Sequence, residues 1–261
     1  MKNRTKIPNL YLALILIFMY LPIAIVIVYS FNENKLTAIW SGFSLKWYSE
    51  LFQDKDLMEA LKNSLILGVL SCFCAGVIGT IGAVGMARLN YKTKGVMEYL
   101  SMLPIMIPEI ILGMVFLAFF SAISLPFGMT TLVIAHTTFC IPYIYMMVKA
   151  RLVGMDPALL EAARDLGASE IRAFWDITLP LIMPAVASGS LLAFAMSFDD
   201  VVISVLVTNS RINTLPIKVF SRIKFGVSPE INALSTIMLS VTLIIILGIV
   251  RINKKNRGGN L

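Results

Sequence analysis

The most informative part of the sequence is Glu161-Ala162-Ala163-Arg164-Asp165-Leu166-Gly167, followed after a spacer by Ile177-Thr178-Leu179-Pro180. Two long apolar runs, 128–148 and 181–207, flank this charged, helix-forming stretch. The chain has 261 residues, of which 58% are hydrophobic and only 14% are charged. A soluble fold of this length could not bury so much apolar surface, so lipid must solvate much of the chain. The charged stretch must then lie outside the bilayer, where a partner can contact it.

Six apolar runs have the roughly 20 residues that a helix needs to cross a bilayer. They are 8–30, 64–87, 96–121, 128–148, 181–207 and 231–250. The sequence therefore predicts an all-α membrane protein with six transmembrane helices in a single domain, 1–261. Gly76, Gly79, Gly82 and Gly85 predict close helix packing along the second run.

The first run follows Lys2, Arg4 and Lys6 but is too long for a signal peptide and lacks a small-x-small cleavage site, so we expect it to remain as an anchor. With the N-terminus inside, 14 of the 22 Lys and Arg residues fall in cytosolic segments. This asymmetry predicts that both termini and the segment 156–180 are cytosolic.

The residues needed for a soluble catalytic or nucleotide site are missing from the sequence. There is one histidine, His136, and no Gly-x-x-x-x-Gly-Lys-Ser/Thr loop, so ATP could act only through another subunit. Cys72, Cys74 and Cys140 lie in apolar runs and are interpreted as packing residues, not as metal ligands or a disulfide framework. We therefore expect this chain to bind no cofactor and no metal, and to catalyse no reaction.

The segment 156–180 is predicted to form two short amphipathic helices. Asp156 followed by proline is a strong helix start, Gly167 suits a left-handed C-terminal position, and Ser169 can cap the second helix. Pro180 is expected to break the chain before the next apolar run. On these residues alone, the pair could rest on lipid headgroups or present a docking surface to a partner.

The spacing Glu-Ala-Ala, three residues, Gly, nine residues, Ile-x-Leu-Pro resembles the signature loop of ABC importer permeases. All seven marked positions match: Glu161, Ala162, Ala163, Gly167, Ile177, Leu179 and Pro180. Four further strings, 40–51, 137–142, 197–202 and 226–233, resemble the permease subunits of spermidine and putrescine importers within this family.

The resemblance implies a type I ABC importer permease fold in the bacterial inner membrane, working by alternating access. It implies that Glu161 and its neighbours form a coupling helix that contacts an ATPase subunit. The implied partners are a second permease subunit, two copies of an ATPase that uses ATP and Mg, an external binding protein and membrane lipid, with no nucleic acid.

Three carboxylates, Glu109, Asp199 and Asp200, fall well inside the predicted spans. A charge at the bilayer centre costs roughly 2.5–3.5 kcal/mol on insertion scales, so such acids are functional candidates. Every Lys and Arg can be assigned to a loop or a span end, which leaves only His136 as a counterion and favours a cationic substrate.

Residues near these acids extend the predicted substrate pathway. Ser197 shares a helix face with Asp200, and that face is expected to line the path. Pro104 and Pro108 can break the helix next to Glu109, as in other transporter sites. Trp47 could stack on a substrate amine or belong to an interfacial aromatic belt.

Other interpretations stay open. Asp199 could cap a helix or pair with another subunit, and Glu109 could satisfy local backbone N–H groups. An ABC permease for another cationic or small polar solute would keep the same coupling loop. A proton-coupled secondary transporter would explain the acids but not the loop.

Overall fold

The structure, a computed structural model, describes residues 6–35, 39–88, 92–224 and 229–258. These residues are helical apart from turns, short extended stretches and one isolated bridge between Asn32 and Phe43, as the sequence predicts. Lys2, Arg4 and residues 226–228, which contribute to the predictions above, lie outside the described residues. The chain divides into two compact units, Met1–Met58 with Val219–Leu261, and Glu59–Lys218.

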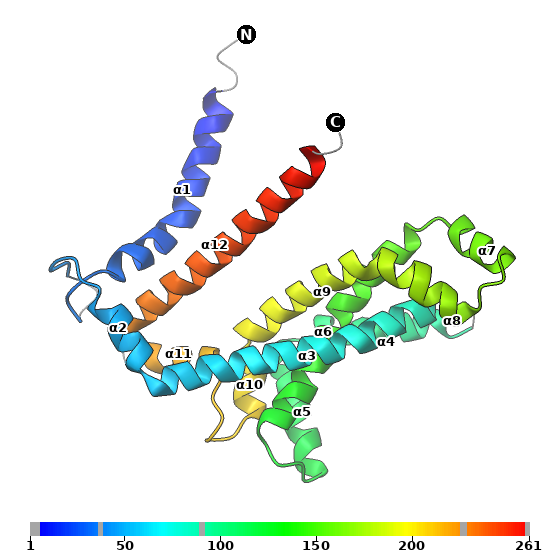
Figure 1. Cartoon of the computed structure of the whole chain (residues 1–261). Helices are drawn as coiled ribbons and strands as arrows, with labels where there is room; N and C mark the ends of the chain where they lie inside the picture. Colours follow the sequence, from blue (N-terminus) through cyan, green and yellow to red (C-terminus); the bar gives the residue numbers. More distant parts are fainter. Residues whose placement is uncertain (1–5, 36–38, 89–91, 225–228, 259–261) are drawn as a thin grey trace. The chain divides into compact units, whose positions relative to one another are not determined.

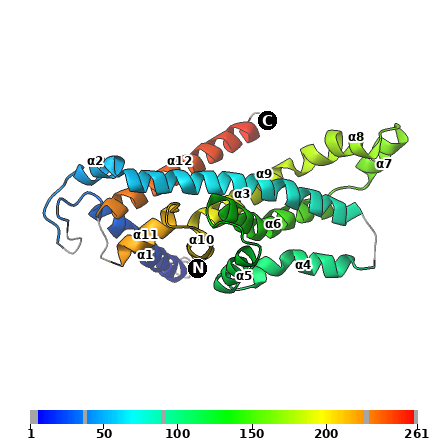
Figure 2. The ribbon, with the colours of Figure 1, turned by 90° about the horizontal axis from the view of Figure 1, so that it is seen from below.

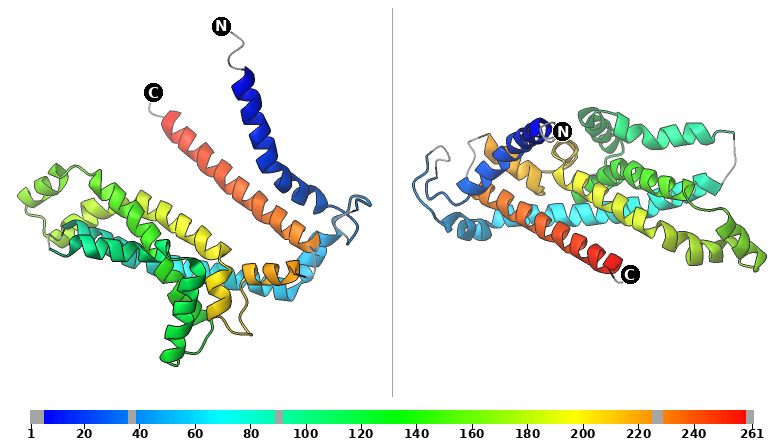
Figure 3. Two further views of the ribbon diagram at one scale, coloured as in Figure 1. Left: turned by 180° about the vertical axis from the view of Figure 1, so that it is seen from behind. Right: turned by 90° about the horizontal axis from the view of Figure 1, so that it is seen from above.

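The first unit contains α1 (Lys6–Tyr29), α2 (Lys46–Gln53) and α12 (Pro229–Gly258), with the ends of α3 (Lys55–Arg88) and α11 (Leu215–Ile223). Helices α1 and α12 pack against each other and run in opposite directions (Figures 1 and 3). α2 packs against α12. An arginine at the end of α11, Arg222, forms ion pairs with Asp54 and with Glu230 of α12.

The second unit is built around α6 (Met129–Val153), which packs against α4 (Lys94–Met106), α5 (Glu109–Ala122), α9 (Leu179–Asp199) and α10 (Val202–Val207). The most deeply buried apolar side chains of α6 lie on several sides of the helix, because neighbouring helices surround it. They are Leu132, Ala135, Cys140, Ile144 and Val148, all fully buried.

Two glycines in this unit let the backbone of a neighbouring helix come closest. A Cβ added at Gly79 of α3 would lie 3.1 Å from the carbonyl oxygen of Ile141, and one at Gly189 of α9 would lie 3.0 Å from the Cα of Ile144. Of the glycine stripe predicted for the second run, Gly79 therefore provides the close approach. Gly85, at the other end of the stripe, faces open space.

Four described helical segments are long and apolar enough to cross a membrane: Pro8–Tyr29, Lys55–Arg88, Met129–Val153 and Glu170–Asp199. A fifth candidate is the pair α4 and α5, which is bent by 104° (Figure 2). Pro108 stands at this bend, immediately before α5, so the break predicted from the prolines is present. The described apolar part of α12, Pro229–Ile244, is shorter.

The connection from α6 to α9 contains α7 (Ala158–Asp165), α8 (Glu170–Ala173) and a π turn, Phe174–Thr178. The predicted capping is present. The Asp156 carboxylate accepts the Ala158 N–H at 3.0 Å, Gly167 has φ +78°, and Ser169 Oγ accepts the Arg172 N–H at 3.3 Å.

The chain does not break at Pro180, contrary to the sequence prediction. The helical segment continues from Glu170 to Asp199 through the π turn. Pro180 falls directly after this turn, in the first turn of α9. The regular ladder of α-helical hydrogen bonds is already interrupted there, so the missing proline N–H is tolerated.

Candidate functional site

The matched loop residues lie at one end of the second unit, on and after α7 (Figure 1). Glu161 and Ala162 are exposed, and Ala163 is buried against the rest of the unit. Leu159 and Leu166, two large apolar side chains of the same segment, are 46% and 88% exposed. Helix α7 therefore presents a mixed apolar and acidic surface that the described part of this chain does not cover.

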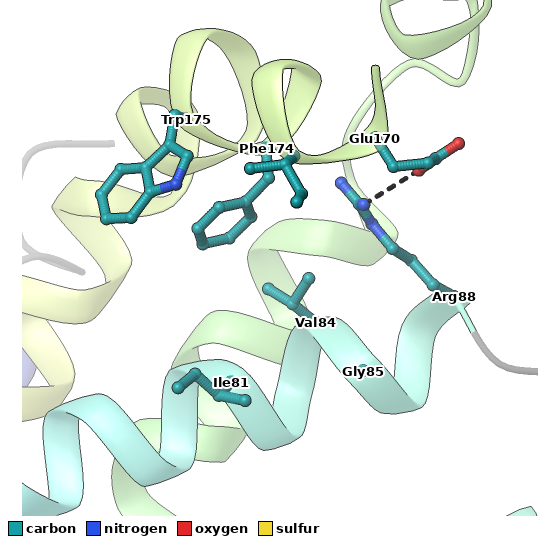
Figure 4. Close-up of a pocket in the computed structure, with 8 residues that line it drawn as sticks. Ile81, Val84, Gly85, Arg88, Glu170, Phe174 and Trp175 are labelled. Atoms are coloured by element: carbon teal, nitrogen blue, oxygen red, sulfur yellow. Dashed lines mark hydrogen bonds and ion pairs between the residues drawn. The ribbon is translucent and has the colours of Figure 1, made fainter.

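Glu170 connects this surface to α3. Its Oε2 lies 3.1 Å from Arg88 Nη1, and its Oε1 lies 2.7 Å from Arg164 Nη2 (Figure 4 shows the first contact). Arg88 also donates to Thr178 Oγ1 at 3.2 Å. One carboxylate thus joins the last residue of α3, the end of α7 and the start of α8.

A cavity of about 390 Å³ lies beside the Arg88–Glu170 pair. Ile81, Val84 and Gly85 of α3 line one side, and Ile171, Phe174 and Trp175 line the other (Figure 4). The other side chains that line this cavity between α3 and α8 are apolar. Among the lining residues, the Arg88–Glu170 ion pair is therefore the polar contact between the two helices.

Glu109 is the first residue of α5, immediately after the bend. Its carboxylate is exposed, and it lies close enough to Tyr143 of α6 to interact electrostatically with the phenol. No described residue forms an ion pair or side-chain hydrogen bond with it. A helix break next to an uncompensated acid resembles the irregular backbone that lines binding sites in other transporters.

Asp199 and Asp200 occupy opposite environments. Asp199 is the last residue of α9 and is exposed, whereas Asp200 is 8% exposed. The Asp200 carboxylate accepts the N–H groups of Ile203 at 3.1 Å and Ser204 at 2.7 Å, which caps α10. Asp200 Oδ2 also lies 3.4 Å from His136 Nε2.

The polar face predicted to line the pathway turns inward in this structure. Ser197 Oγ lies 2.8 Å from His136 Nδ1, and Ser204 Oγ lies 3.0 Å from His136 Nε2. The prediction treated 181–207 as one helix, but α9 ends at Asp199 and α10 begins at Val202. Asp200 and Ser197 both contact His136. The sequence identified this histidine only as a possible counterion.

Trp47 belongs to the first unit and is 3% exposed. Its indole N–H donates to the carbonyl of Asn32 at 2.6 Å. The Asn32 side chain in turn accepts the Ser41 N–H at 3.0 Å and donates to the carbonyl of Ile39 at 2.7 Å. Trp47 thus helps to order the loop before α2, and its ring is buried in this structure. Its stacking on a substrate amine and its place in an interfacial belt stay predictions.

Comparison with known proteins gives concordant matches. A family model described as binding-protein-dependent transport system inner membrane component matches residues 75–255. The spermidine/putrescine transport system permease protein PotC of Shigella flexneri is 40% identical over 247 residues, 94% of each chain. The putrescine transport system permease protein PotI of Escherichia coli (strain K12) is 41% identical over 229 residues, 85% of this chain and 82% of that one.

Among solved structures, a chain of a bacterial ABC transporter involved in the import of the acidic polysaccharide alginate superposes with a TM-score of 0.71. The two chains are 18% identical, and the match covers 94% of this chain and 92% of that one. At this identity the likeness concerns the fold alone.

Proposed function

Since this chain belongs to the family of binding-protein-dependent transport system inner membrane components, we propose that it is the permease subunit of an ATP-driven importer of spermidine and putrescine. The names of the PotC and PotI relatives support the substrate class. The structural observation that supports a polyamine substrate is the pair of exposed carboxylates, Glu109 and Asp199, each at a helix end next to a break.

The protein is a multi-pass membrane protein, and we infer six spans in the bacterial inner membrane. They are α1, α3, the bent pair α4–α5, α6, α9 with α10, and α12. An even number of spans puts both termini on one side, and the excess of Lys and Arg assigns that side to the cytosol. The loop with Glu161 then also faces the cytosol.

The substrate carries ammonium groups, which exposed carboxylates can bind by charge-assisted hydrogen bonds. Glu109 and Asp199 are the acids available for this task, because the Asp200 carboxylate already caps α10 and contacts His136. Ser197 and Asp200 support the pathway from behind in this proposal, while Trp47 orders the loop before α2. Each acid contributes only part of the binding energy, as suits a pathway through which the substrate must leave again.

The importer needs partners that this chain does not supply. They are a second permease subunit of PotB type, two copies of an ATPase of PotA type that use ATP and Mg, and an external binding protein of PotD type. The exposed Glu161, Ala162 and Leu166 on and after α7, with Ala163 and Gly167 shaping the segment, form the surface for the ATPase. Closure of the ATPase on ATP moves α7 and α8, and the membrane helices alternate between outward and inward openings.

The test is uptake of labelled spermidine by right-side-out vesicles that contain the whole complex. Glu109→Gln and Asp199→Asn should each raise KM by about tenfold or more, because a hydrogen bond to a charged group contributes roughly 1.5–3 kcal/mol. Glu50→Gln, which removes an exposed carboxylate paired with Lys46, is the matched control and should leave KM unchanged. Unchanged uptake in both acid variants would refute the acidic pathway.

A further inference from the structure

The break between α9 and α10 lies within an apolar segment and is held by a buried polar cluster. Backbone groups freed in lipid must find partners inside the protein. At this break the Asp200 carboxylate accepts the N–H groups of Ile203 and Ser204. The break is therefore a specified feature of the fold.

His136 of α6 spans the break with both ring nitrogens. Nδ1 bonds Ser197, three residues before the break, and Nε2 bonds Ser204, on α10 beyond it. The ring is fully buried and packs 5.1 Å from the Phe139 ring, measured between centroids. Serine hydroxyls can donate or accept, so each can pair with the ring nitrogen that it faces.

The exposed Asp199 lies between these anchored positions. Ser197 is two residues before it, and Asp200 follows it directly. A change in the backbone at Asp200 would therefore swing the Asp199 carboxylate. Loss of the histidine would leave Ser197 and Ser204 without their common partner. The orientation of α9 relative to α10 would then no longer be fixed by these hydrogen bonds.

We propose that His136 is a positioning residue that holds the α9–α10 break in the geometry presenting Asp199 to the substrate. The inference rests on the proposed function, in which Asp199 binds an ammonium group of the polyamine. His136 itself does not touch the substrate, because the surrounding helices bury it completely. It acts through Ser197, Asp200 and Ser204.

A double-mutant cycle in the assembled transporter tests this role. His136→Gln should raise KM for spermidine about five- to tenfold, with kcat and the basal ATPase rate retained. In an Asp199→Asn background, His136→Gln should raise KM no further, because the carboxylate that His136 positions has already been removed. Thr138→Val is the matched control, because among the described residues the Thr138 hydroxyl bonds the Ile134 carbonyl alone, on the exposed side of α6.

The outcomes separate the inference from the proposed function. An unchanged KM for Asp199→Asn alone would overturn the substrate contact and the inference with it. A raised KM for Asp199→Asn with an unchanged KM for His136→Gln overturns the inference alone. Additive effects in the double variant also overturn it, because they would assign His136 a general structural role.

A second measurement does not depend on transport. The reaction rate of Asp199→Cys with a small cationic thiol reagent should change several-fold when His136→Gln is added, in a background whose native cysteines are replaced by serine. Ala195→Cys, also exposed on α9, should react at the same rate with and without that change. Equal rates at position 199 would overturn the proposal.

Ser204→Ala serves if His136→Gln prevents assembly, because it removes a single hydroxyl from the cluster. It should reproduce the rise in KM and the absence of a further effect with Asp199→Asn. Failure of both variants to assemble overturns the proposal, since the cluster would then act in folding.

Discussion

At the scale of single residues, two adjacent aspartates have different surroundings and different roles. Asp199 is exposed at the end of α9, while Asp200 is buried and accepts two backbone N–H groups. A buried carboxylate persists only when hydrogen bonds and nearby charge replace water. In the proposed function, the same residue type therefore binds substrate at one position and fixes the backbone at the next.

Asp54 provides a pH-dependent test at this scale. Burial alone raises the pKa of its carboxyl, but the hydrogen bond and charge of Arg222, with the Leu57 and Asp56 N–H groups, outweigh burial and hold the pKa below its usual value. A depressed pKa contributes stability that is present above the unfolded value, about 3.9, and is lost as pH falls through the folded value.

Asp54→Asn keeps an acceptor for the Leu57 N–H and removes the charge. We expect the variant to unfold at a lower temperature than the parent at pH 7, with the difference shrinking as pH falls below about 3.9. Thermal unfolding in detergent, followed by circular dichroism, measures this. A difference that stays constant or widens in acid would contradict the role of the ion pair; Glu50→Gln should show little difference at either pH.

At the scale of helices, the contact between α3 and α6 depends on one missing side chain. A Cβ at Gly79 would press on backbone atoms of Ile141 and Tyr145, which cannot rotate away. Gly79→Val should therefore destabilise the protein by about 1–3 kcal/mol, the usual range for overpacking. Gly85→Val, on the same helix but facing open space, should leave the unfolding midpoint nearly unchanged.

The link between α3 and α8 predicts a charge-reversal result. Arg88 and Glu170 are partly exposed, so their ion pair contributes little to stability. If it transmits movement of α7 and α8 to α3, Arg88→Glu or Glu170→Arg should lower the amount of spermidine imported per ATP hydrolysed. The double reversal should restore part of it.

Reversal of the exposed Lys46–Glu50 pair is the control and should leave this ratio unchanged. Equal losses in the single and double reversals would show that the pair does not transmit the movement.

At the scale of the whole molecule, import requires the ATPase to move the permease. Glu161 lies on an exposed helix that the described residues of the chain leave uncovered. Glu161→Arg should abolish spermidine uptake while membrane insertion stays normal, which fractionation and uptake assays measure separately. Normal uptake in this variant would rule out coupling through α7.

The sequence predicts those parts of the molecule that depend on local chemistry. The apolar runs, the break at Pro108 and the caps at Asp156, Gly167 and Ser169 all follow from neighbouring residues. The break at Asp200 has no proline or glycine to mark it and depends on His136, 64 positions earlier in the chain. Burial of Trp47 likewise depends on Asn32, which no periodic pattern identifies.

The π turn before α9 changes how its surface should be mapped. The Leu179 N–H bonds the carbonyl of Phe174, five residues earlier, so the turn holds one residue more than an α-helix would. One extra residue rotates all later positions by about 100°. A helical wheel drawn straight through 170–199 would place α9 side chains on the wrong face, so scanning mutagenesis should number 170–173 and 179–199 as separate registers.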